Sequence, residues 1–236
     1  MNNDYFKILR EFLEKSGRLA IERQSKITGC NKNDGSILTE TDLEISNLFQ
    51  DFIEKNFDSH YIFDEEKALK DKNLKENIAK SEYIWVIDPI DGTKTYFHGS
   101  NLFCIGLSLY RNSTPVFGLI YLPSTSQLIY NDDNGVYYIA NIFTKQEEKS
   151  QIFFQQKELN KNSLVYFPVK SAAKYIKNYK FTFIDSYSAY IYAFDVLRNI
   201  TQGAFLKDNI SIFYSIKLQL IEKVWIRSQK SSTKSY

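Results

Sequence analysis

Four short β-type segments in the middle of the chain restrict its fold more than any other feature of the sequence. They cover residues 103–110, 116–122, 127–130 and 136–139, and the pair Asn134-Gly135 between the last two is a strong hairpin signal. Tight turns of this kind join antiparallel neighbours. We therefore predict an antiparallel meander, with further strands before it at 61–63 and 83–87.

Two amphipathic helices are predicted ahead of these strands. Apolar residues recur at helical spacing over residues 4–23, where Asn3 or Asp4 can cap the helix, and again over residues 39–56. A polar loop at 26–36 joins the two helices, and residues 67–82 are predicted as helix and loop. Beyond the meander we expect a boundary in the polar stretch 144–162, strands at 164–167 and 181–184, helices at 171–178, 188–200 and 210–222, and a frayed tail at 227–236.

The composition excludes several functional classes. Thirty Lys and Arg residues against 28 Asp and Glu give a net charge of +2, too balanced for binding nucleic acid or an anionic membrane through bulk charge. Two cysteines allow at most one disulfide, and two histidines form no zinc-type cluster with them. No stretch approaches the ~18 apolar residues of a membrane span, and no secretory signal is recognisable. The expectation is a soluble, cytoplasmic protein.

The chemically richest motif is the segment WVIDPIDGTK. An apolar strand ends there in two carboxylates, Asp88 and Asp91, and Pro89 predicts a turn because proline cannot continue a strand ladder. Such a turn can aim both carboxylates and the Ile90 carbonyl at one point, an oxygen-rich site of the kind that Mg²⁺ prefers. The alternative is a capped turn that starts a helix, with Thr93 as the cap.

Two other acidic segments can join this site. The segment DEE, at 64–66, follows a predicted strand, and the segment TETD, at 39–42, opens the second helix. Each also has a simpler interpretation, a solvated acidic turn for the first and helix capping for the second. Together with Asp88 and Asp91 they supply the parts of a two-metal phosphoryl-transfer site.

These motifs resemble those of the inositol monophosphatase superfamily of Mg²⁺-dependent, lithium-sensitive phosphatases. The family carries T-x-A-D, then G-E-E, then W-x-x-D-P-[IL]-D-G-T, and this chain has TETD, DEE and WVIDPIDGT in that order. The resemblance implies a layered αβαβα sandwich, with an N-terminal α+β part at 1–150 that carries the motifs and a C-terminal α/β part at 151–236, shortened relative to the family. It also implies in-line attack of a metal-activated water on a small phosphate monoester, and a homodimer as one expected state.

The resemblance assigns a role to each matching residue. About two or three Mg²⁺ ions would be held by the metal ligands Glu65, Asp88, Ile90 (through its carbonyl) and Asp91. The attacking water would be oriented by the catalytic residues Thr93, Asp42 and Glu65. The substrate would be bound by Gly92, Thr93, Lys94 and Lys32, of which Lys32 stands in a loop that closes over the site in relatives.

The second half of the chain departs from the family pattern. The W-D motif, whose Asp completes a metal site, is absent, and so is the Gly before Glu-Glu, replaced by Asp64. Asp208 is the candidate replacement for the missing acid, with Asn209 next. The alternative of another class is a degenerate member that binds metal or phosphate without turnover.

The substrate class rests on one residue, Lys94, which follows D-G-T. Inositol phosphatases tend to have Thr there, whereas relatives acting on 3′-phosphoadenosine 5′-phosphate tend to have Lys. This favours a 3′(2′),5′-bisphosphate nucleotidase. Inositol monophosphatase and histidinol-phosphate phosphatase are the alternatives, since some of the latter also have Lys at this position.

Overall fold

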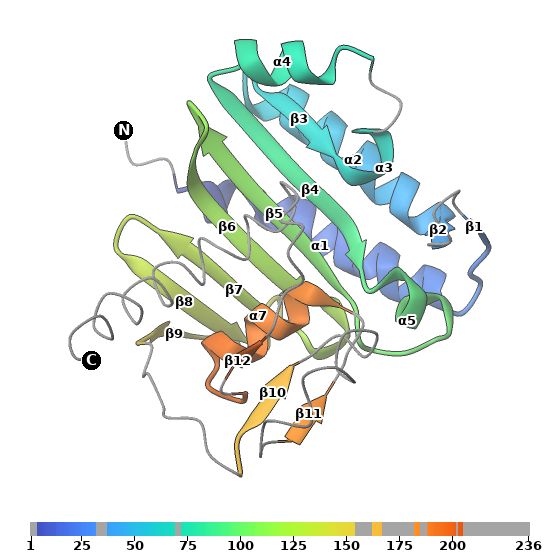
Figure 1. Cartoon of the computed structure of the whole chain (residues 1–236), viewed down its shortest axis with the longest axis vertical. Coiled ribbons are helices and arrows are strands. Elements are labelled where there is room, and N and C mark those ends of the chain that lie inside the picture. The colour runs from blue at the N-terminus through green and yellow to red at the C-terminus, as the bar shows by residue number, and fades with distance from the viewer. Residues whose placement is uncertain are drawn as a thin grey trace, which may run out of the picture.

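A mixed seven-stranded sheet forms the centre of the molecule (Figure 1). The computed structural model describes residues 4–31, 37–68, 72–153, 162–166, 182–184, 188–201 and 203–204. Neighbouring strands are antiparallel except β3 and β4, which run parallel. In spatial order the strands are β3 Tyr61–Asp64, β4 Tyr83–Asp91, β5 Cys104–Arg111, β6 Thr114–Leu122, β7 Gln127–Asp132, β8 Gly135–Ala140 and β9 Glu148–Ile152.

The predicted meander is confirmed as β5 to β8. The turn between β7 and β8 is fixed by Asp132, whose Oδ1 accepts hydrogen bonds from the backbone N–H of Asn134 at 2.7 Å and of Gly135 at 3.1 Å. Two sets of strands in the first 152 residues were not predicted. The polar stretch 144–162 contains β9, and the polar loop leads into a small hairpin of β1 Gly29–Asn31 and β2 Ile37–Thr39. Strand β9 is polar, and β1 and β2 have three residues each, too few for a hydrophobic alternation to be recognised.

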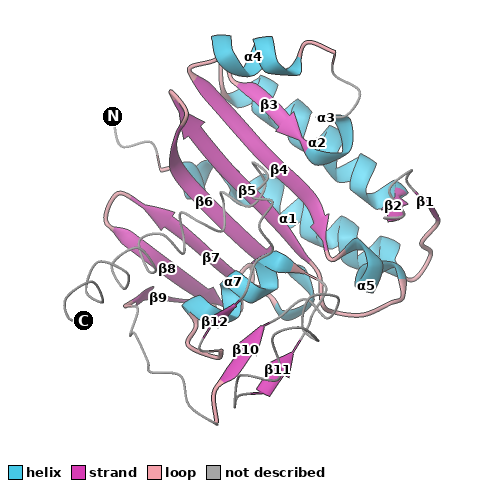
Figure 2. Cartoon of the chain, viewed as in Figure 1, coloured by secondary structure: helices cyan, strands magenta, loops and turns pink. Residues whose placement is uncertain are grey.

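Two long helices cover one face of the sheet, as predicted from their apolar spacing (Figure 2). They are α1 Tyr5–Gln24 and α2 Glu40–Asn56. Between them and the sheet lies Trp85, which is fully buried and makes edge-to-face contacts with Tyr5, Phe49 and Phe117. Aromatic contacts of this geometry add stability beyond the area they bury. This face is the larger of the two hydrophobic cores and holds β4 rigidly in place.

The opposite face carries α7 Ala189–Leu197, with α3 Glu65–Ala68 and α4 Leu74–Lys80 near β3 and β4 (Figure 1). Seven of the nine residues of α7 are buried, so it is a core helix. Next to it lies a small parallel sheet in the order β11-β10-β12, made of β10 Leu164–Tyr166, β11 Thr182–Ile184 and β12 Gly203–Ala204. The short elements are α5 Thr93–Phe97 and the 3₁₀ turn η1 Pro123–Thr125.

Helices, sheet, helices and second sheet thus follow one another in layers, in agreement with the expected sandwich. The helices predicted at 171–178 and 210–222 and the tail at 227–236 lie outside the described residues. The division at residue 150 stays a prediction. Within the described part of the chain, no helix has the length and apolar character needed to cross a membrane.

Candidate active site

A one-residue bulge brings Asp88 and Asp91 to the same face of the sheet. Asp88 pairs with Gly106 and Asp91 pairs with Cys104, so three residue steps on β4 match two on β5. Without the extra residue, side chains three apart would point to opposite faces. The turn predicted at Pro89 is therefore wrong. β4 continues through the proline, and a bulge is one of the few places in a sheet that tolerates it, because ladder hydrogen bonds are already interrupted there.

Asp88, which is buried, and Glu65 form a hydrogen-bonded pair in the acidic site. Asp88 is 7% exposed, and the side chain of Glu65, at the start of α3, forms a hydrogen bond with it. Burial, and then the negative charges of Glu65 and Asp91, raise the pKa of Asp88 well above its ordinary value. Two carboxyl groups can share a hydrogen bond only when one of them holds a proton. A positive ion beside the pair would offset the same repulsion.

The parallel pairing of β3 and β4 explains why these acids meet. In the register of the two strands, Asp64 lies opposite Ile87. Glu65, which begins α3 directly after β3, therefore comes beside Asp88 on β4. Asp64 itself turns to the local backbone, where its Oδ1 accepts a hydrogen bond from the Glu66 N–H at 2.9 Å. The DEE segment is therefore not a solvated turn: Asp64 is buried at the end of β3, and Glu65 and Glu66 begin α3, with Glu65 hydrogen-bonded to Asp88.

Asp42 is part of the capping box at the start of α2, and its negative charge also acts on Asp88. It is fully buried at the start of α2, where its Oδ2 accepts a hydrogen bond from the Thr39 N–H at 2.9 Å. The Thr39 hydroxyl in turn accepts one from the Asp42 N–H at 3.3 Å, which completes a capping box. The charge of Asp42 also contributes, as a smaller cause, to the raised pKa of Asp88. The two interpretations of the TETD segment are therefore compatible.

Asp91 is held by hydrogen bonds from the start of α7, a helix that comes much later in the sequence. Its Oδ2 accepts hydrogen bonds from the Ser188 hydroxyl at 2.8 Å and from the Tyr190 N–H at 2.7 Å, and the Cys104 Sγ lies 4.0 Å away. Ser188 is the N-cap of α7, and a carboxylate is favoured beside the positive end of a helix. The sequence predicts a helix beginning at 188. Nothing in the local pattern shows that its first turn meets Asp91.

Gly92 and Thr93 form the turn that leads from the acidic strand into α5. Gly92 is the N-cap, with a left-handed backbone (φ +89°), and a Cβ there would lie 2.8 Å from the Leu102 carbonyl oxygen. The Thr93 hydroxyl donates a hydrogen bond to the Ile90 carbonyl at 2.8 Å. The interpretation of Thr93 as the helix cap is therefore wrong, since glycine occupies that position. Lys94 follows on the exposed side of α5.

The acids are neighbours, yet they do not form a ready-made metal cage. Within the described ranges, no three His, Cys, Asp or Glu side chains converge as a metal-binding group. Two contacts account for this: Asp88 is hydrogen-bonded to Glu65, and Asp91 is held by α7. The donor chemistry nevertheless fits Mg²⁺, because all the donors are oxygens and a cation would relieve the charge repulsion that raises the pKa of Asp88. Lys32, Asp208 and Asn209 lie outside the described residues.

A cavity of about 670 Å³ lies elsewhere, at the opposite end of the strands. Its lining includes Tyr83, at the start of β4, whereas Asp88 stands near the end of the same strand. The acidic edge, with its neighbouring carboxylates and the raised pKa of Asp88, has the features of a functional site, whereas this cavity lies away from those acids.

Comparison with known proteins agrees with this geometry. Residues 5–193 match the sequence model of the inositol monophosphatase family. The fructose-1,6-bisphosphatase/inositol-1-monophosphatase of Thermotoga maritima is 28% identical over 127 residues, which are 53% of this chain and 46% of the relative. The inositol-1-monophosphatase of Bacillus subtilis is 34% identical over 94 residues, 40% of this chain and 33% of the relative. The chain thus spans less than half the length of these curated relatives.

A solved structure of an inositol monophosphatase family protein from Staphylococcus aureus superimposes with a TM-score of 0.75 at 14% identity, covering 92% of this chain and 80% of that one. At this identity the superposition supports the fold, and the family model, which matches most of the chain, supports the relationship itself. With the acidic motifs brought to one edge of such a fold, the chain belongs to the inositol monophosphatase family.

Proposed function

We propose that this chain hydrolyses a small phosphate monoester with Mg²⁺ as its cofactor. The observation that carries the proposal is the meeting of Glu65, Asp88 and Asp91 at one sheet edge, where burial and mutual repulsion raise the pKa of Asp88. A solved structure of the same fold, an IMPase/NADP phosphatase in complex with Mg²⁺ and phosphate, supports it with a TM-score of 0.75 at 15% identity.

The residues that would hold the metal are Glu65, Asp88, Asp91 and the carbonyl of Ile90, for about two or three ions. When bound, the metal supplies positive charge to the phosphoryl oxygens and lowers the pKa of a bound water. The protein prepares this place in two ways. Glu65 and Asp88 lie within hydrogen-bond distance of each other, and Asp91 is kept at the edge by its contact with α7. Asp208 is proposed as the remaining acid, and inhibition by lithium is proposed from the family.

Thr93 is proposed to orient the attacking water. Its hydroxyl hydrogen is committed to the Ile90 carbonyl at 2.8 Å. A hydroxyl oxygen that donates its hydrogen in one direction can still accept in another. Thr93 can therefore accept a hydrogen bond from the water and leave the lone pair of that water directed at phosphorus. Glu65 and Asp42, the other acids of the site, are proposed to complete this water network.

The substrate we propose is a 3′(2′),5′-bisphosphate nucleotide. Lys94 is exposed one residue after Thr93, so its ammonium group can reach a second phosphate outside the acidic edge. The backbone N–H groups of Gly92 and Thr93, together with Lys32, are proposed to bind the phosphate that is cleaved. Inositol phosphates and histidinol phosphate remain the alternative substrates.

Phosphate release from a substrate panel tests this proposal. The panel contains 3′-phosphoadenosine 5′-phosphate, inositol 1-phosphate and histidinol phosphate, each with Mg²⁺ and with a chelator. We expect Mg²⁺-dependent turnover that Asp88→Asn abolishes, and a rise of about tenfold in KM for the bisphosphate in Lys94→Gln, the worth of one charged hydrogen bond. Equal KM values in Lys94→Gln and the wild type would refute the nucleotidase assignment. No release from any substrate would refute the phosphatase.

The second candidate is a family member that binds metal or phosphate without turnover. It is favoured by the absence of a ready-made metal group in the described residues. A rise in melting temperature with Mg²⁺ and phosphate, combined with no phosphate release from the panel, would identify it, because a ligand that binds only the folded state stabilises that state.

A further inference from the structure

Gly106 leaves a gap beside the buried carboxyl of Asp88. The two residues are direct partners in the β4–β5 ladder, so their side-chain positions lie next to each other on the same face. Because glycine has no side chain, the space next to Asp88 is left for another element to fill.

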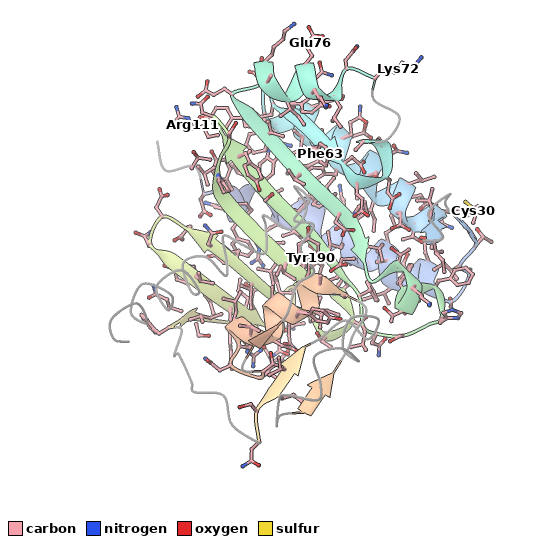
Figure 3. All side chains as sticks on the ribbon, in the orientation of Figure 1. Cys30, Phe63, Lys72, Glu76, Arg111 and Tyr190 are labelled. Carbon is pink, nitrogen blue, oxygen red and sulfur yellow. The ribbon has the colours of Figure 1, made fainter. Side chains whose placement is uncertain are left out.

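The ring of Tyr190, from α7, occupies that gap. A Cβ on Gly106 would lie 2.7 Å from the Tyr190 Cζ, 2.8 Å from Cε2 and 3.1 Å from Cε1. These three atoms form the hydroxyl end of the ring, so it is the polar end of the phenol that sits on the glycine. Figure 3 shows Tyr190 between α7 and the strands that carry the acids. The hydroxyl end therefore lies at the position next to Asp88 in the ladder.

Tyr190 meets the acids through its main chain as well as its ring. Its backbone N–H donates to the Asp91 Oδ2 at 2.7 Å. The residue is 1% exposed. A neutral phenol carries one hydrogen that it can donate. A buried tyrosine hydroxyl ordinarily finds a hydrogen-bond partner, and the carboxyl of Asp88 is the ladder neighbour of the position that this end of the ring fills.

We propose that Tyr190 is a positioning residue of the metal site, whose hydroxyl and backbone N–H hold Asp88 and Asp91 in the orientation that accepts the cation. The inference rests on the proposed metal-dependent function and adds to it a residue that none of the acidic motifs contains. Groups that hold metal ligands from behind commonly change metal affinity by about 10–100-fold when they are removed. Tyr190 holds two ligands of the site at once, from a helix that arrives late in the sequence.

The test compares Tyr190→Phe with Tyr192→Phe. The first variant keeps the ring on Gly106 and removes only the hydroxyl. The second removes a hydroxyl from the same helix at a position that is similarly buried (4% exposed). Mg²⁺ binding is measured by calorimetry, and melting temperature is measured in parallel. We expect Tyr190→Phe to weaken Mg²⁺ binding about tenfold or more, and Tyr192→Phe to leave it unchanged.

A spectroscopic signal and a second variant distinguish the loss of the Tyr190 hydroxyl from a loss of folding. Mg²⁺ should produce a near-ultraviolet tyrosine difference signal in the wild type that disappears in Tyr190→Phe. Gly106→Ala should weaken Mg²⁺ binding too, because its methyl group pushes the ring away from Asp88. Unchanged Mg²⁺ affinity in Tyr190→Phe, or an equal loss in Tyr192→Phe, would overturn the inference and leave the proposed function intact. Failure of the wild type to bind any Mg²⁺ would overturn both.

Discussion

Alanine in place of Gly92 should destabilise the turn that follows the acidic strand, and a second glycine shows how much of the effect is steric. Gly92 (φ +89°) and Gly99 (φ +77°) both have left-handed backbones. A Cβ on Gly92 would lie 2.8 Å from the Leu102 carbonyl oxygen, whereas one on Gly99 would meet nothing within 4 Å. The two substitutions therefore share the backbone cost and differ in the clash.

The expected magnitudes follow from this difference. A left-handed backbone costs an ordinary residue about 1–2 kcal/mol, and an extra methyl group in a filled space adds about 1–3 kcal/mol. Gly92→Ala should then lose about 2–5 kcal/mol and Gly99→Ala about 1–2 kcal/mol. For a chain of this size, the losses correspond to falls in melting temperature of about 10 °C and about 4 °C.

Thermal unfolding followed by circular dichroism, without added metal, measures both variants under the same conditions. The wild type and Gly99→Ala set the scale against which Gly92→Ala is judged. Equal falls in melting temperature for the two variants would show that the Leu102 carbonyl moves aside without cost, and the steric argument would then fail.

Three other predictions concern the site and its support. Thr93→Ala should lower kcat by about 10²–10⁴-fold with little change in Mg²⁺ affinity, and a fully active variant would reject the proposed role of Thr93. Asp88→Asn should raise the metal-free melting temperature, since it removes a buried acid surrounded by like charges. The same variant should lose the stability gain of about 2.7 kcal/mol that Mg²⁺ gives the wild type at 100 times its Kd. A variant that still gains stability from Mg²⁺ would show that the ion binds elsewhere. The His60 ring, whose Nδ1 accepts the Trp85 Nε1–H at 3.0 Å and which stacks on Tyr83, has a pKa lowered by burial. At low pH the unfolded chain therefore takes up a proton at His60 that the folded chain does not. This contribution to the free energy of unfolding is present above about pH 6.5 and is lost as the pH falls below it. In urea unfolding between pH 7 and pH 5, the free energy of unfolding should fall less steeply for His60→Phe than for the wild type, and parallel curves would contradict the assignment.

Much of the fold could be predicted because its signals are local. The spacing of apolar residues fixes α1 and α2, and the pair Asn134-Gly135 fixes the β7–β8 hairpin within a few residues. The acidic motifs could be found for the same reason, since each one is a contiguous segment. Strand β9 could not be predicted, because its residues are mostly exposed and polar and it owes its place to pairing with β8.

The details of the site depend on register and on distant contacts, which a sequence pattern does not contain. The bulge after Asp88 decides which face Asp91 takes, and it shows only when β4 is paired with β5. The contacts of Ser188 and Tyr190 with Asp91 join segments almost 100 residues apart. No sequence pattern indicates that the ring of Tyr190 lies over Gly106.

The hydrogen bonds between Asp91 and the start of α7 also determine when the site can form during protein synthesis. Ser188 follows Asp91 by 97 residues, and a ribosome adds about 5–20 residues per second, so roughly 5–20 s separate the two. During that interval strands β5 to β9 are made and can pair, while α7 does not yet cover the acids. A nascent chain halted before α7 would therefore carry every acidic motif and still lack the contact that holds Asp91. Translation itself sets the order in which the site is completed.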